Sequence, residues 1–451
     1  MRKIIPKKDQ IQDLATVSEI LNSKDNEAVQ KFNSLNFQQQ LELVLDTTGK
    51  ERLELLYLSD CFNSLVQAMP APEILFTYEE VGMDAALPII AATSHEQFTF
   101  LTDILCWNKD EIDPNALIGW LQILAECGDL KIQDWLAKVE SELFILILKT
   151  LVKIDKCDEE GNPPEFLQSR NIFTIDGMYY FEFLYTNAID PLQTILSIFR
   201  DEDPDGFRGI MEAVIWIDQC QIEIYTSYFR QSRLSEWGFP ELEEAMEIYQ
   251  YFAPKEREKV IQELEKGLSE WAELDATPRY PIKLKDQNGF LSISLRYVEN
   301  DRRLARFSHE LVLIANKVQV ADGIEDFSFQ QNISIASQKT TGYVTLGLAE
   351  LSNSDPIKAA ELIGRVHTER LFQVGFSQVE DLARKARRLA EKPERFNQLH
   401  STDREILKGL LSSKPKFYTG DKSLTVENYI DFQEPEQIQE CQKILKRIEQ
   451  L

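Results

Sequence analysis

The sequence of 451 residues predicts a mainly α-helical protein, an irregular solenoid-like array of helical hairpins with a small β-hairpin insertion. Three observations predict it. Apolar residues recur at helical spacing along most of the chain. A unit of two short helices joined by a polar turn recurs at irregular intervals. Finally, Asp is a preferred N-cap and proline suits the first helical position, so Asp-Pro pairs mark helix starts. The pairs are Asp113-Pro114, Asp190-Pro191, Asp203-Pro204 and Asp355-Pro356.

The recurring unit consists of an apolar helix, a short polar turn and a second apolar helix. Copies occur at 43–56, 88–101, 123–136 and 248–260. Their irregular spacing differs from that of strict-period repeat families. It fits stacked hairpins in which each pair buries its apolar face on a neighbour.

Capping boxes mark three further helix starts. In this motif a Ser or Thr hydroxyl accepts from the third backbone N–H, and a Glu or Gln side chain reaches back to the cap. The pattern predicts that motif at Thr48 with Glu51, at Ser94 with Gln97 and at Thr402 with Glu405.

One segment departs from helical spacing. Residues 171–185 are rich in β-branched and aromatic side chains around Asp176-Gly177, a strong signal for a hairpin turn. A second Asn-Gly pair, Asn288-Gly289, also has apolar flanks, although Leu291 is an equally good start for a helix. The chain between 157 and 164 is polar and rich in helix breakers, which indicates a loop.

Helical periodicity lapses around residues 275–290, where the charge balance also changes. We therefore expect two regions: an acidic helical array over 1–275, with its β-hairpin near 171–185, and a neutral helical region over 276–451. The first region should begin with a short amphipathic helix over 10–22. The second should hold helices at 300–320, 356–374, 376–391, 402–412 and 434–451, with a loop at 412–424.

The acidic residues are concentrated in the first 250 positions. Residues 1–150 hold 12 Lys and Arg against 24 Asp and Glu, and residues 151–250 hold 7 against 20. Residues 251–451 are balanced, with 30 against 31, within a total net charge of −26. Such a field repels nucleic acid and anionic membranes and favours cationic partners. An acidic surface also serves solubility alone.

The cysteines and apolar runs indicate a compartment. Six cysteines are scattered with no C-x-x-C pair, so we expect reduced and mostly buried thiols. No long apolar run follows the basic start of the chain, and the longest run, Leu143 to Leu148, is far shorter than a membrane span. We expect a cytoplasmic protein.

The sharpest chemical motif lies at 201–212. It matches the calcium loop of an EF-hand at each specified position, with Gly206 at the centre. Pro204, Arg208 and Gly209 are unusual in such a loop. A simpler interpretation is that Asp203 caps a helix whose first residue is Pro204. The candidate ligands for Ca²⁺ or Mg²⁺ are Asp201, Asp203, Asp205 and Glu212.

Other patterns are less specific. The four histidines are too far apart for a helical zinc pair, and the chain lacks the phosphate-binding and nucleophile-elbow motifs of common enzymes. A basic run over 384–388 fits a solvated helix face, although it also suits RNA, an acidic partner or the acidic half of the chain. The six tryptophans fit core packing, with a binding groove as the alternative.

Several local signatures together resemble an uncharacterised bacterial domain-of-unknown-function family of helix-rich soluble proteins. They are Met69-Pro-Ala-Pro-Glu-Ile-Leu75, Gly82-Met-Asp-Ala-Ala-Leu87, Asp103-Ile-Leu-Cys-Trp107, Thr174-Ile-Asp-Gly-Met-Tyr-Tyr180 and Leu346-Gly-Leu-Ala-Glu-Leu351. The resemblance covers most of the chain and implies no activity or site residues. The N-terminal half is also similar in pattern to the helical superhelix of the magnesium-transporter gate domain and of the flagellar motor switch protein, which favours metal sensing.

We therefore expect a non-catalytic cytoplasmic helical scaffold or adaptor that binds a protein partner along a helical groove. No cofactor, nucleic acid or membrane is expected among its ligands. Two alternatives stay open. One is a divalent-cation sensor through the acidic stretch 201–212, and the other is an enzyme whose site the sequence does not disclose.

Overall fold

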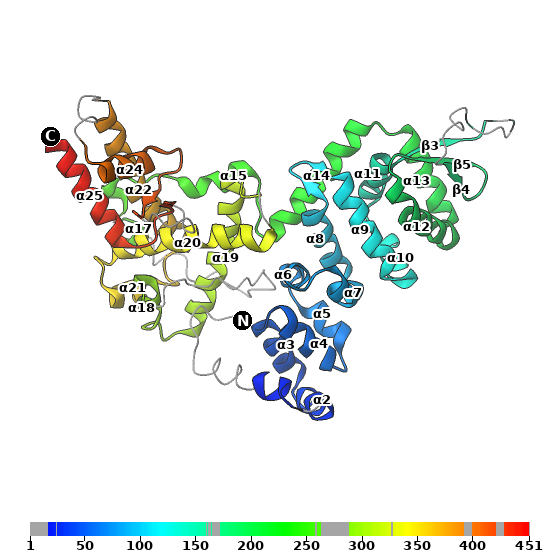
Figure 1. The fold of residues 1–451 in the computed structure, drawn as a ribbon, viewed down its shortest axis with the longest axis horizontal. Helices are drawn as coiled ribbons and strands as arrows, with labels where there is room; N and C mark the ends of the chain where they lie inside the picture. Colours follow the sequence, from blue (N-terminus) through cyan, green and yellow to red (C-terminus); the bar gives the residue numbers. More distant parts are fainter. Residues whose placement is uncertain are drawn as a thin grey trace. The chain divides into compact units, whose positions relative to one another are not determined.

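The protein is mainly α-helical, with only short antiparallel strands in the part of the chain that the computed structural model describes (Figure 1). It describes residues 17–23, 25–158, 160, 164, 172–257, 259–262, 288–325, 328–391, 399–420 and 428–450. The chain forms two compact units, Leu14–Trp237 and Gly238–Leu451. Each helix in the described ranges is too short or too polar to cross a membrane.

The first unit is an array of short helices that pack on near neighbours along the chain, for example α4 on α6 and α6 on α8. Its helices are α2 (Asp25–Asn33), α3 (Phe37–Asp46), α4 (Gly49–Leu58), α5 (Phe62–Ala68), α6 (Ala71–Val81), α7 (Met83–Ala92), α8 (His95–Leu105), α9 (Pro114–Glu126), α10 (Asp129–Leu136), α11 (Ser141–Leu151), η1 (Thr186–Ala188), α12 (Ile189–Glu202), α13 (Pro204–Trp216) and α14 (Gln219–Glu236). Of the predicted helix 10–22, residues 17–21 are helical and 10–16 lie outside the described residues.

Three of the four Asp-Pro pairs start helices as predicted. The carboxylates of Asp113, Asp203 and Asp355 each accept a hydrogen bond from the backbone of the first turn, at 2.8, 2.9 and 2.9 Å. Asp190 is different: the turn η1 runs directly into α12, so the helix starts at Ile189 and Asp190 lies inside its first turn without a capping bond.

The capping boxes are confirmed at one of the three predicted places. At the start of α8 the backbone N–H of Gln97 donates to the hydroxyl of Ser94, and the backbone N–H of Ser94 donates to the side-chain oxygen of Gln97. Thr48 is the N-cap of α4 but makes no side-chain capping bond, and Thr402 lies inside α24 because that helix already begins at Ser401. A box that was not predicted joins Asn36 and Gln39 at the start of α3.

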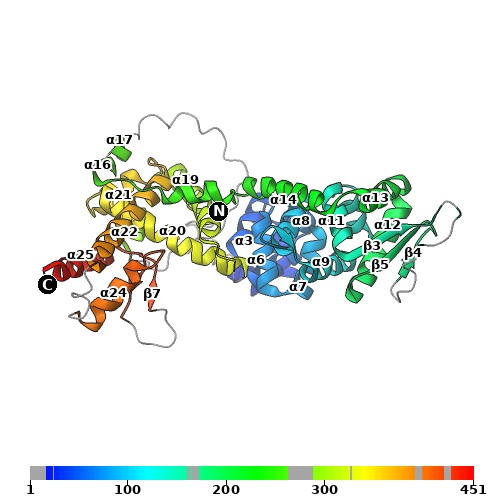
Figure 2. The same ribbon diagram turned by 90° about the horizontal axis from the view of Figure 1, so that it is seen from above.

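The predicted β-hairpin is confirmed. β4 (Ile172–Thr174) and β5 (Tyr179–Phe183) pair antiparallel across the Asp176-Gly177 turn. A strand that was not predicted, β3 (Val152–Lys156), pairs with the other edge of β5. The three strands lie beside α12 and α13 (Figure 1 and Figure 2). A further strand pair, β1 (Trp107–Asn108) with β2 (Glu111–Ile112), follows α8.

A chain of aromatic contacts joins the sheet to the helices. The ring of Phe144 in α11 lies 5.4 Å from that of Phe199 in α12, which lies 5.7 Å from Phe207 in α13. Phe207 in turn meets Tyr179 of β5 at 6.1 Å. All four side chains are buried, so this core fixes the position of α13 and the chain that follows it.

The second unit is built around two long helices, α20 and α22, which pack along each other (Figure 1). Its elements are α15 (Leu242–Met246), η2 (Glu247–Tyr249), α16 (Pro254–Arg257), α17 (Lys259–Gln262), α18 (Phe290–Leu295), α19 (Asp301–Asp322), α20 (Phe329–Leu351), α21 (Pro356–Leu362), α22 (Thr368–Ala390), α24 (Ser401–Leu411), β6 (Phe417–Tyr418), β7 (Tyr429–Ile430) and α25 (Pro435–Gln450). The strands β6 and β7 pair antiparallel.

Glycines let α20 and α22 approach closely. A Cβ atom on Gly347 of α20 would lie 1.9 Å from the backbone oxygen of Leu371, and one on Gly375 of α22 would lie 1.9 Å from that of Tyr343. Gly375 therefore belongs inside a helix. The break predicted between 374 and 376 occurs instead at 363–367, where Gly364 has a φ of +68°.

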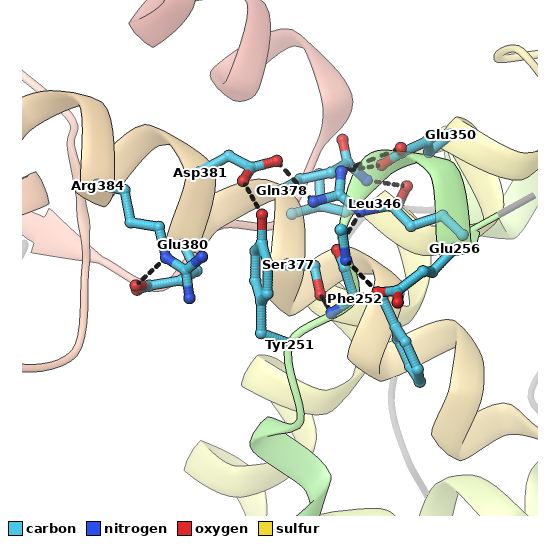
Figure 3. A network of polar contacts seen from close by, with 12 residues as sticks. Tyr251, Phe252, Glu256, Leu346, Glu350, Ser377, Gln378, Glu380, Asp381 and Arg384 are labelled. Atoms are coloured by element: carbon cyan, nitrogen blue, oxygen red, sulfur yellow. Dashed lines mark hydrogen bonds and ion pairs between the residues drawn. The ribbon is translucent and has the colours of Figure 1, made fainter.

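The structure divides the chain at Gly238, earlier than the boundary expected at 275–290. The segment after Gly238 packs on the second unit, with α15 on α19 and η2 on α22. Arg257 of α16 is buried and forms ion pairs with Glu350 of α20 and Asp381 of α22, at 3.1 and 2.6 Å. Tyr251 also donates to Asp381 at 2.7 Å (Figure 3).

The Asn288-Gly289 pair starts a helix, because α18 begins at Phe290. The other flank of the alternative hairpin, 282–287, lies outside the described residues.

Candidate protein-binding surface

The helix α14 presents a large apolar surface to solvent. Asp218 caps it by accepting from the backbone N–H of Gln221 at 3.2 Å. Its inner side buries Ile222, Thr226 and Leu234 against the unit, where α14 packs on α11 and α8.

Four large apolar side chains of α14 are exposed to solvent. Ile224 is 68% exposed and Tyr228 is 65% exposed, next to Tyr225 at 49% and Phe229 at 37%. We call these four residues the α14 face. Two residues before the helix cap, the side chain of Trp216 is 73% exposed. Single exposed apolar side chains are ordinary on soluble proteins, whereas a contiguous group of them marks an interaction surface.

The α14 face has a regular geometry. Ile224 and Tyr228 are four residues apart, as are Tyr225 and Phe229, so the four side chains form two neighbouring ridges. The rings of Tyr228 and Phe229 meet edge to face, with centroids 5.9 Å apart. The groove between two such ridges is the feature into which a ridge of another helix packs.

Arginines hold α14 firmly on the unit. Arg233 donates to both carboxylate oxygens of Asp103 at 2.8 Å and also pairs with Glu140. Arg230 donates to the backbone oxygens of Asp103 and Lys109, and its guanidinium lies over the ring of Trp107. A helix fixed in this way offers its outer face with little loss of conformational entropy on binding.

The surroundings of the α14 face are acidic. From Asp201 to Phe229 the chain holds seven Asp and Glu residues against one basic residue, Arg208. The whole unit Leu14–Trp237 holds 38 Asp and Glu against 15 Lys and Arg, a net charge of −23. Nearly all of the net negative charge of the chain thus belongs to the unit that carries the α14 face.

The candidate metal ligands do not lie in an open loop. Asp201 lies in the last turn of α12, Asp203 caps α13, and Asp205 and Glu212 lie within α13. Asp201 pairs with Arg200 and Asp205 with Arg208. Within the described residues, His, Cys, Asp and Glu side chains form no group of three able to hold a metal ion. Metal binding at 201–212 stays a prediction.

The carboxylate of Glu212 accepts hydrogen bonds from three other side chains. It accepts from Lys156 of β3 at 3.0 Å, from the hydroxyl of Tyr179 at 2.9 Å and from the indole N–H of Trp216 at 3.0 Å. The hydrogen bond from Lys156 is the main cause that lowers the pKa of Glu212. Burial, together with the hydrogen bond to Glu212, raises the pKa of Tyr179 to about 12. Glu212 therefore stays charged and anchors α13 to the sheet.

The other residues predicted for sites are dispersed. In the basic run, Arg384 and Arg387 pair with Glu380, and Lys385 pairs with Glu449. Trp107, Trp120 and Trp135 are buried as expected for core packing, Trp216 is exposed, and Trp271 lies outside the described residues.

All six cysteines are free, but the expectation that most are buried is wrong. Only Cys106 and Cys441 are buried, while Cys61 and Cys220 are exposed.

The α14 face was not predicted, although the sequence carries a signal for it. Apolar residues fall on both sides of this helix: Ile222 on the inner side, and Ile224, Tyr225 and Tyr228 on the outer side. A surface helix that covers only a core needs one apolar stripe, so a second stripe indicates a second contact.

A family of unknown function, DUF6178, matches residues 29–451. The chain belongs to this family. The match spans nearly the whole sequence, in agreement with the resemblance to an uncharacterised helix-rich family. No curated protein and no solved structure matches the chain.

Proposed function

We propose that this member of DUF6178 is a non-catalytic helical scaffold or adaptor that binds a protein partner. The observation that carries the proposal is the α14 face: a contiguous group of exposed aromatic and aliphatic side chains on a helix that salt bridges hold in place. Tyrosine and tryptophan are frequent among the residues that dominate protein–protein affinity. An exposed apolar surface of this kind favours association over a purely structural role.

The experiment compares three forms of the full chain, each recovered with its bound proteins from the native host. They are the wild type, the face variant Ile224→Ser/Tyr228→Ser, and the control variant Tyr57→Ser/Leu130→Ser. The control removes two side chains that are 54% and 83% exposed on α4 and α10, away from the α14 face. Both variants keep the net charge and alter only exposed positions, so folding stability should change by less than about 0.5 kcal/mol per site.

We expect a partner that is recovered with the wild type and the control variant and is depleted at least about tenfold with the face variant, since hot-spot losses reach 2 kcal/mol or more. Equal recovery with all three forms, or no partner with any of them, would contradict the proposal.

A further inference from the structure

We propose that the partner docks on the α14 face through a cationic amphipathic helix. This inference rests on the proposed function and names the chemistry of the partner. It depends on the shape of the face and on the sign of the charge around it.

The shape favours a helix. The rows Ile224–Tyr228 and Tyr225–Phe229 run side by side at the inclination of i, i+4 ridges, and the groove between them accepts an i, i+4 ridge of a second helix. A β-strand would instead need free backbone groups for edge pairing. Between its two ends α14 satisfies its backbone groups within the helix and offers only side chains.

The charge favours a basic partner. The two arginines of α14 are taken up by contacts within the unit, Arg230 with backbone oxygens and Arg233 with Asp103 and Glu140. Asp218 caps the helix that carries the face, within a unit of net charge −23. A helix with Leu or Phe on one side and Lys or Arg at its margins would bury its apolar side on the face and bring its charges to this acidic unit.

The same charge disfavours the other occupants of an apolar helix face. A second copy of the chain would bring two units of net charge −23 together, and like charges across an interface are unfavourable. An anionic membrane or a nucleic acid would meet the same repulsion.

Binding of synthetic peptides to the full chain tests the inference. The probe is a peptide of about 18 residues, five helical turns, built from Leu and Lys with Leu along one side. One control peptide has the same composition in an order without an apolar side. The other has Glu in place of Lys. Each peptide is titrated by calorimetry into the wild type, the Ile224→Ser/Tyr228→Ser variant and the Tyr57→Ser/Leu130→Ser variant.

We expect the amphipathic Lys peptide to bind the wild type and the Tyr57→Ser/Leu130→Ser variant with equal affinity and the face variant at least about tenfold more weakly, because two apolar anchors are lost. Its affinity should fall as the salt concentration rises from about 50 to about 500 mM, because the charges are screened. The peptide without an apolar side and the Glu peptide should bind the wild type at least about tenfold more weakly.

Equal binding of the Lys peptide to wild type and face variant overturns the inference, as does tighter binding of the Glu peptide. Dimerisation of the wild type that the face variant lacks, or binding of the wild type to vesicles through the face, also overturns it. If a native partner depends on the α14 face while the Lys peptide does not bind there, the proposed function stands and only the cationic helix is rejected. If neither depends on the face, both fail.

Discussion

Single carboxylates decide where several helices of this protein begin. Asp113, Asp203 and Asp355 accept hydrogen bonds from otherwise unpaired backbone N–H groups, and the proline that follows lacks such a group. The same logic applies to the acidic stretch 201–212, where the capping role of Asp203 accounts for its position without a metal ion. Glu212 is likewise explained by its three hydrogen-bond donors.

Replacing these caps gives the first prediction. Asp203→Ala should lower the free energy of unfolding by about 1 kcal/mol, because a capping bond is lost. The loss should be the same with and without added CaCl₂, measured by urea denaturation. Asp205→Ala is the control, since that side chain is 96% exposed and should change stability by less than about 0.5 kcal/mol. A calcium-dependent stabilisation that Asp203→Ala and Glu212→Gln both abolish would instead support the metal site.

Apolar spacing, capping residues and turn residues predicted the helices and the hairpin that depend on interactions between residues close in sequence. Apolar spacing was enough for α19, α24 and α25, the Asp-Pro caps were enough for the starts of α9 and α13, and the Asp176-Gly177 turn was enough for the β-hairpin. The strand β3 was not predicted, because it directly continues the apolar run of α11 and no local sequence signal separates the strand from the helix. Glycine is a poor helix former, so Gly375 predicts a helix break in the sequence. In the structure it lies inside α22, where its missing side chain lets the backbone of α20 approach. Gly347 of α20, 28 positions earlier in the chain, allows the same close approach from the other helix.

The close approach of α20 and α22 gives the second prediction. Gly347→Ala and Gly375→Ala should each lower the free energy of unfolding by a net amount of about 1 to 2 kcal/mol. The added methyl group forces the two backbones apart at a cost of about 2 to 3 kcal/mol, which exceeds the gain of about 1 kcal/mol from helix propensity. Urea denaturation followed by circular dichroism measures both.

Gly119→Ala is the matched control within α9. Apart from its chain neighbours and the backbone of its own helix, no atom lies within 4 Å of the Cβ position at Gly119, so this change should stabilise the protein by about 0.5 to 1 kcal/mol. If all three substitutions are stabilising, the close helix packing is refuted.

At the scale of the whole molecule, the unit boundary separates charge as well as structure. The unit Leu14–Trp237 carries nearly all of the negative charge, and the unit that starts at Gly238 is close to neutral by comparison. The sequence indicated two regions of different charge with a border at 275–290, whereas Tyr249, Tyr251 and Arg257 contact the second unit through residues distant in sequence. Their partners, Asp322 and Asp381, lie more than 70 positions away.

This border gives the third prediction. A fragment of residues 238–451 should unfold cooperatively, whereas a fragment of residues 276–451 should be strongly destabilised. The shorter fragment lacks Arg257, so Glu350 and Asp381 lose their cationic partner, and Tyr249 no longer covers Lys339. Glu350 and Asp381 are 29% and 37% exposed, so the loss of Arg257 costs less than the about 3 to 5 kcal/mol of a fully buried pair. Equal thermal midpoints for the two fragments would contradict the boundary at Gly238.

The central claim is that the α14 face docks a protein, and site-specific photocrosslinking in the native host tests it most directly. A photoreactive benzoylphenylalanine replaces Tyr228 on the face in one form of the full chain and Tyr57 on α4 in another. Both tyrosines are more than half exposed, so the two positions differ in place and not in accessibility. We predict a discrete protein adduct from position 228 that is missing from position 57. No adduct from position 228, or the same adducts from both positions, would contradict the claim.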